Sequence, residues 1–193
     1  MKEPEIMDKS FERKYAINIA RLGPGKHIDD FELKADFFRV FENADILNAN
    51  IAVDIEMEKY ETHLDMNLRL AGEVTLACDR CSEPYNHLLE THERIIYSFE
   101  PDLDFEGYEV MYTDRMEPQL VLVQELYDFV NMAIPIRRVP EISVHICAPE
   151  VLELLGLDAQ GDPIPPDATE AEEEDSPADP RWEKLRQLKD KLN

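Results

Sequence analysis

The sequence predicts an α+β fold: a predominantly antiparallel β-sheet, open or partly closed into a barrel, with one packed helix and a detached C-terminal helix. Two observations lead to this prediction. Between residues 49 and 99, long runs of alternating apolar and polar residues are typical of strands with one face in water. Residues 117–133 instead carry their apolar side chains at helical spacing.

The N-terminal part is predicted to begin with a strand over residues 13–22. There Tyr15, Ile17 and Ile19 alternate with smaller or polar residues, and Gly23-Pro24-Gly25 follows as a turn. Residues 31–41 supply more apolar side chains with a mixed spacing, which indicates a strand followed by a helical turn.

The clearest pattern is a long hairpin formed by residues 49–57 and 64–70, with a turn near residues 60–61. We expect a bulge at Gly72, after which residues 74–78 continue the alternation. Another strand is predicted over residues 87–99. The C-x-x-C motif formed by Cys78 and Cys81 therefore lies at a turn between two strands.

The C-terminal half is predicted to contain a short strand at residues 108–112 and a helix over residues 117–133, which Pro135 ends. We expect a β-rich core domain over residues 1–157. Residues 158–179 contain nine acidic residues, four prolines and no basic residue, so they are predicted to be a disordered linker. Asp179-Pro180 then suits the start of a basic amphipathic helix over residues 180–193.

Charge and composition restrict the function classes. The net charge of -23 opposes binding to DNA and other nucleic acids and favours a basic protein partner. No apolar run is long enough for a membrane helix, and the first residues do not resemble a signal peptide, so we expect a soluble protein of the cytoplasm. The odd count of three cysteines argues against a secreted disulfide framework.

The cysteines and one histidine form a candidate metal site. Cys78 and Cys81 have the spacing by which a turn presents two thiolates to zinc, and His145 and Cys147 would point to the same side of a strand. A Cys3His structural zinc site is one interpretation. The alternatives are that the cysteines pack as small apolar residues, or that the C-x-x-C is a redox pair, although such pairs normally start a helix.

No motif indicates catalysis: the chain has no Gly-rich phosphate loop and no H-E-x-x-H. The candidate partner-binding residues are basic residues of the core domain and residues of the terminal helix. That helix either docks on its own domain or serves as a tethered recognition element. The candidates are Arg80, Arg137, Arg138, Arg181, Trp182, Lys184, Leu185, Leu188 and Lys189.

Three landmarks together resemble a known family. They are G-E-V-T-L-A-C-D-R-C at residues 72–81, A-I-P-I-R-R at residues 133–138 and D-P-R-W-E-K-L at residues 179–185. In this order they resemble the YceD-like large ribosomal RNA subunit accumulation proteins. Many of those relatives carry more cysteines after the I-P segment, whereas only Cys147 follows it here, so a metal site would need His145.

The resemblance implies a non-enzymatic factor needed for accumulation or processing of large-subunit ribosomal RNA. In relatives it is often encoded beside a zinc-binding protein of that subunit. The expected partner is a pre-ribosomal large-subunit particle or a basic ribosomal protein held by the acidic surface; direct contact with ribosomal RNA is left open. The competing hypothesis is a thiol or zinc-dependent enzyme that uses the C-x-x-C pair.

Overall fold

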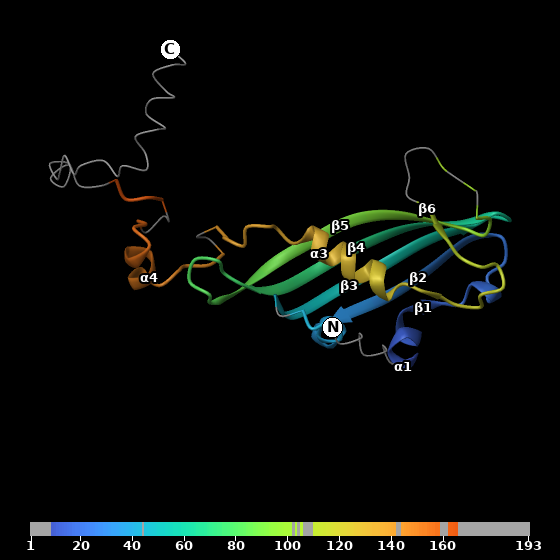
Figure 1. Ribbon diagram of the computed structural model, residues 1–193, viewed down its shortest axis with the longest axis horizontal. Helices are drawn as coiled ribbons and strands as arrows, with labels where there is room; N and C mark the ends of the chain where they lie inside the picture. The colour runs from blue at the N-terminus through green and yellow to red at the C-terminus, as the bar shows by residue number, and fades with distance from the viewer. Residues whose placement is uncertain are drawn as a thin grey trace, which may run out of the picture. The chain divides into compact units, whose positions relative to one another are not determined.

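One five-stranded sheet organises the chain, with the strand order β2-β3-β4-β5-β6 (Figure 1). The computed structural model describes residues 9–43, 45–101, 103, 105, 110–141, 144–158 and 162–165. The chain divides into two compact units, residues 1–151 and 152–193, and the sheet belongs to the first. Its strands are β2 (Gly25–Lys34), β3 (Ile46–Lys59), β4 (His63–Ala77), β5 (Pro84–Ser98) and β6 (Val110–Tyr112).

The predicted hairpin is confirmed, because β3 and β4 pair antiparallel with Ile55 opposite Leu68. The β2–β3 and β4–β5 pairs are also antiparallel, and only the short β6 runs parallel to its neighbour β5. The sheet does not close on itself. Of the two predicted architectures, the structure therefore has the open antiparallel sheet.

One face of the sheet is buried, as the alternation predicts. Ile51, Val53, Ile55 and Leu70 are 0% exposed on this face. It is covered by α2 (Ala35–Arg39), which buries two phenylalanines, and by α3 (Val123–Ala133), which contacts β5 and lies across the strands at an angle (Figure 1). Each strand places every second side chain on this face, so the apolar residues form one core.

The strand predicted over residues 13–22 is wrong in most of its length. The segment contains the 3-10 turns η1 (Arg13–Tyr15) and η2 (Ile19–Arg21), with only β1 (Ala16–Ile17) between them. β1 pairs with the equally short β7 (Leu120–Val121). The side chain of Asn18 accepts a hydrogen bond from the backbone N–H of Arg21, and such a local bond competes with strand pairing.

Two further details differ from expectation. The helix predicted from residue 117 begins at Val123, because residues 120–121 are taken into β7. The bulge expected at Gly72 is absent: the register shift lies between Ile46 and Asn48. Gly72 instead allows β3 a close approach, since a Cβ there would lie 2.2 Å from the carbonyl oxygen of Asn50.

The C-terminal predictions mostly lie outside the described residues. α4 (Pro149–Leu154) is followed by a turn in which Leu157 and Pro163 form an isolated bridge. The terminal helix over residues 180–193 and most of the acidic linker are not described, so they and the domain boundaries stay predictions. Within the described part of the chain, no helix has the length and apolar character needed to cross a membrane.

Candidate functional site

The C-x-x-C motif lies in the turn between β4 and β5, as predicted. The turn is closed by two backbone hydrogen bonds, from Cys78 N–H to the Glu83 carbonyl (2.9 Å) and from Ser82 N–H to the Cys78 carbonyl (2.8 Å). Ser82 adopts the left-handed backbone conformation with φ 61°. The turn leaves the Cys78 side chain 1% exposed and that of Cys81 half-buried.

His145 and Cys147 come from the chain that follows α3, which we call the return segment (residues 134–148). The strand predicted for this pair is wrong, because residues 144–148 form no strand. Instead the N–H groups of Val144 and His145 both donate to the carbonyl of Glu141 and form a turn. The spacing of two still brings both donor side chains to one place, and Cys147 is buried.

The four predicted metal ligands come together. Their ligand atoms all lie within 4.8 Å of one another. The Sγ atoms of Cys78 and Cys147 are 3.8 Å apart, and Cys81 Sγ lies 3.0 Å from His145 Nε2. A zinc tetrahedron with Zn–S bonds of about 2.3 Å has sulfur–sulfur edges of about 3.8 Å. The first distance fits such an edge and is far too long for a disulfide.

The electrostatics of the cluster favour a thiolate at Cys78. Burial pushes the pKa of the Cys78 thiol upward, but hydrogen bonds from the backbone N–H groups of Cys81 and Arg80 and from the Cys81 and Cys147 side chains outweigh it, so the pKa is lowered. Burial and the neighbouring sulfurs raise the pKa of Cys147 to about 12. The pKa values of these two thiols are thus shifted in opposite directions. A divalent cation would favour the thiolate form of both, because it stabilises several thiolates at once.

The donor set fits zinc. Three sulfurs and an imidazole nitrogen are the ligand types of structural zinc sites, and four protein donors complete a tetrahedron. Such a set leaves no position for water or a substrate, which a catalytic zinc needs. The cluster is thus capable of holding a metal ion between the hairpin turn and the return segment.

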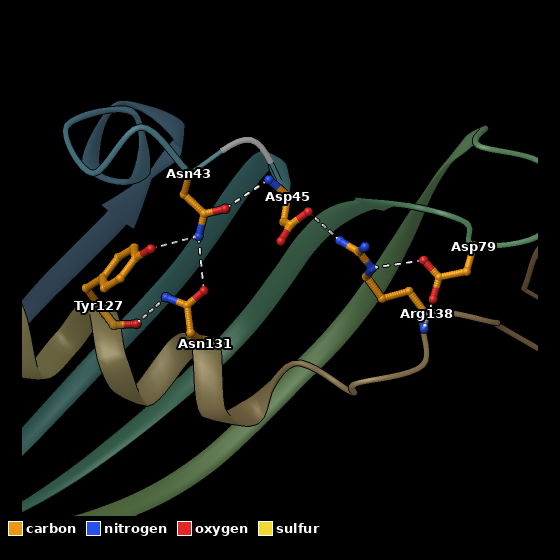
Figure 2. Close-up of polar contacts among 6 residues, drawn as sticks. All are labelled: Asn43, Asp45, Asp79, Tyr127, Asn131 and Arg138. Carbon is orange, nitrogen blue, oxygen red and sulfur yellow. Dashed lines mark hydrogen bonds and ion pairs between the residues drawn. The ribbon is translucent and has the colours of Figure 1, made fainter. Parts of the chain in front are cut away.

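A polar contact joins the two ligand-bearing segments beside the cluster (Figure 2). Asp79 N–H donates to the Arg138 carbonyl (3.0 Å), and Arg138 N–H donates to Asp79 Oδ2 (2.7 Å). The guanidinium of Arg138 contacts Asp79 through Nε (3.2 Å) and Asp45 through a terminal nitrogen (2.7 Å). We call this set of contacts, between Arg138, Asp79 and Asp45, the clasp.

The second candidate region is the face of the sheet opposite the helices, which we call the open face. Its carboxylates outnumber its basic groups. Asp30 lies directly opposite Asp54, and Glu58 opposite Asp65, across neighbouring strands. Such like-charge pairs cost stability. The acidic residues of this face are Asp30, Glu32, Asp54, Glu56, Glu58, Asp65, Glu73 and Glu90, and the basic ones Lys26, Lys34, Arg69 and Arg94.

Several ion pairs neutralise part of the open face. Arg69 contacts Glu90 at 2.9 Å and Asp54 at 3.6 Å, and Arg94 contacts Asp65 at 2.6 Å. Within the described ranges, no ion pair reaches Asp30, Glu56 or Glu73. Two adjoining hollows of about 480 and 670 Å³ share Ile28, Glu56 and Asn67. Ile28 is 83% exposed between them.

The comparison with family models shows to which protein family the chain is related. A model described as large ribosomal RNA subunit accumulation protein YceD matches residues 66–189, which is more than half of the chain. The chain belongs to the YceD family. The predicted resemblance is confirmed. No curated protein and no solved structure matches the chain.

In this YceD-family protein the matched span begins within β4 and includes the hairpin turn, α3, Arg138 and all four candidate ligands. β2 and β3, which supply half of the open face, precede it. The candidate ligands are therefore in the part that matches the family model, together with the terminal D-P-R-W-E-K-L segment.

The predicted partner-binding residues have different surroundings in the YceD-family chain. Arg80 is half-buried in the hairpin turn, and Arg137 is exposed. Arg138 is held by the two carboxylates of the clasp and is 25% exposed. The candidates from Arg181 to Lys189 lie outside the described residues.

Sequence reasoning missed Asp45 and Asp79. Asp79 stands inside the C-x-x-C and Arg138 at the end of A-I-P-I-R-R, but 59 positions separate them, and no local pattern joins such distant residues.

Proposed function

We propose that this chain is a non-enzymatic factor in large ribosomal subunit biogenesis, which supports accumulation or processing of large-subunit ribosomal RNA by holding a basic ribosomal protein. The family provides the ribosomal context. The observation that carries the rest is the excess of carboxylates over basic groups on the open face, in a chain with a net charge of -23. The cytoplasm, where ribosomes assemble, is the compartment that this function requires.

The open face suits a cationic protein segment better than RNA. A phosphate backbone is repelled by carboxylates, whereas lysine and arginine side chains are attracted to them and steered toward the face. Ile28 lies between the two hollows and offers an apolar contact among the charged side chains of the open face. Arg80, Arg137 and the terminal helix would serve for contacts with the pre-ribosomal particle.

We assign the Cys-His cluster a structural role in this function. When bound, Zn²⁺ would supply the bond that fixes the return segment to the hairpin turn, and Cys78, Cys81, His145 and Cys147 would hold it. The alternative of a thiol or zinc-dependent enzyme is less well supported, because four protein donors fill a tetrahedral coordination shell.

The test uses the full chain and proteins extracted from purified large ribosomal subunits. We expect the chain to retain one or a few basic proteins, with binding that weakens as salt increases, and to retain little naked ribosomal RNA. In cells, the chain should co-sediment with large-subunit precursors. Exclusive migration with free protein, or preference for RNA over protein, would contradict the proposal.

A charge-reversal pair locates the contact. Asp30→Lys with Glu56→Lys places two cations on the open face, and we expect at least about tenfold weaker binding of the retained protein, or about 1.4 kcal/mol. The control, Glu42→Lys with Glu117→Lys, makes the same charge change at exposed positions away from that face and should weaken binding less than about threefold. Equal effects of the two pairs would show that only the net charge matters.

A further inference from the structure

The described residues of the return segment have little regular secondary structure. Residues 134–141 and 144–148 contain no strand and, apart from the turn at Glu141, run without regular structure until α4. Among the described residues, one backbone–backbone hydrogen bond joins this segment to the hairpin turn, from Asp79 N–H to the Arg138 carbonyl. His145 follows Arg138 by seven positions, so the clasp is the nearest backbone attachment before the ligand pair.

The clasp acts on the same turn that presents the thiols. Asp79 follows Cys78 directly, and its carboxylate accepts both the backbone N–H and the Nε–H of Arg138. A guanidinium offers its donors in a fixed planar fork, so these contacts restrict the direction as well as the distance of the segment. The start of the return segment is thereby fixed relative to Cys78 and Cys81.

The other end of the clasp is braced against α3 (Figure 2). Asp45, which binds the Arg138 guanidinium, donates its backbone N–H to Asn43 Oδ1 at 2.9 Å. The Asn43 amide in turn donates to Tyr127 Oη (3.2 Å) and Asn131 Oδ1 (3.0 Å), both on α3. Arg138 thus lies between the hairpin turn and a loop that is itself held by the helix from which the return segment emerges.

We propose that Arg138 is a positioning residue for the metal centre: by joining Asp79 to Asp45, it preorganises the return segment so that His145 and Cys147 meet Cys78 and Cys81. This inference rests on the proposed Zn²⁺ site. Ordering a free segment costs about 1–2 kcal/mol per residue in backbone entropy, so a segment that is fixed beforehand binds the ion more tightly. Arg138 does not itself touch the ion.

The experiment measures Zn²⁺ affinity and the rate of Zn²⁺ release to a chromogenic chelator for the full chain. We expect Arg138→Gln to weaken Zn²⁺ binding about 10- to 100-fold, the range found when residues that support metal ligands are changed. Arg138→Lys keeps the charge without the fork and should fall between Arg138→Gln and the unchanged chain. The matched control is Arg137→Gln, at the exposed neighbouring arginine, which should change affinity less than about twofold.

Urea unfolding of the metal-free proteins separates positioning from general stabilisation. We expect the difference in stability between Arg138→Gln and Arg137→Gln to be larger with Zn²⁺ bound than without metal. If Arg138→Gln binds Zn²⁺ as tightly as Arg137→Gln, or loses equal stability with and without metal, the positioning role is refuted while the metal site stands. An unchanged chain that binds no Zn²⁺ would refute the metal site and the inference with it.

Discussion

The two segments that form the Cys-His cluster are built in different ways. The hairpin turn is formed by its own neighbours: β4 and β5 pair from His63 to Ser98, and hydrogen bonds within residues 78–83 orient Cys78 and Cys81. The return segment lacks such pairing and is located through Arg138, whose partners Asp79 and Asp45 are distant in sequence. One pair of candidate ligands is therefore positioned locally, and the other pair lies on a segment with tertiary contacts.

This difference indicates which substitutions should affect metal binding and which should affect folding. A rigid hairpin keeps its thiols in place whether or not metal is bound, whereas an irregular segment returns to many conformations once its attachments are lost. We therefore expect changes in the sheet to affect folding, and changes around the return segment to affect metal binding first.

The largest expected effect comes from removing a ligand on the return segment. Cys147→Ser should weaken Zn²⁺ binding by more than about 100-fold, beyond the effect of changing a supporting residue, because serine is a poor replacement for a thiolate. Isothermal titration with Zn²⁺ measures this. Ile146→Ser, at the 75% exposed residue between the two donors, is the control and should bind normally. Normal binding by Cys147→Ser would exclude Cys147 as a ligand.

A change within the hairpin should instead damage the fold. The added Cβ of Gly72→Ala would lie 2.2 Å from the Asn50 carbonyl oxygen and 2.7 Å from Ile51 Cα, so the strands must separate. We expect a loss of about 3 kcal/mol in the free energy of unfolding, measured in urea. Gly23→Ala, where a Cβ meets nothing within 4 Å, should change it by less than about 0.5 kcal/mol. Equal stability of the two variants would contradict this packing.

Chelation compares the two segments within one protein. When a chelator removes Zn²⁺ from the unchanged chain, amide hydrogens of residues 144–148 should exchange at least about tenfold faster, equivalent to about 1.4 kcal/mol. Amides of residues 64–70, in the paired part of β4, should keep their rates. Hydrogen exchange read by mass spectrometry measures both. Equal acceleration in β4 would mean that metal stabilises the whole sheet rather than the return segment.

The smallest effect is expected at Asn43, which links Asp45 of the clasp to α3. Asn43→Ala removes two hydrogen bonds to α3 and one from Asp45, all partly exposed to water, so we expect a loss of about 1 kcal/mol in stability. Zn²⁺ affinity should fall less than with Arg138→Gln, because Asp79 still holds Arg138. A larger fall in affinity than that of Arg138→Gln would place the main support at Asn43.

The sequence alone was sufficient for the elements whose pattern is long and local. Long alternation of apolar and polar residues predicted β3, β4 and β5 and the position of the C-x-x-C between two strands, and three motifs in order predicted the family. It failed where pairing is short: residues 13–22 alternate as a strand does, but only Ala16–Ile17 finds a partner. The spacing of His145 and Cys147 suggested a common side, although the strand expected there does not form.

What the sequence by itself determined is the hydrophobic alternation of the sheet, the excess of negative charge and the choice of four candidate metal ligands. Only the tertiary structure decided that the donor atoms of these residues lie within 4.8 Å of one another. It also decided that Arg138, which we predicted to bind a partner, forms ion pairs with Asp79 and Asp45. The physical reason is that periodicity records which face a residue lies on, whereas the meeting of distant segments depends on chain geometry that no local pattern encodes.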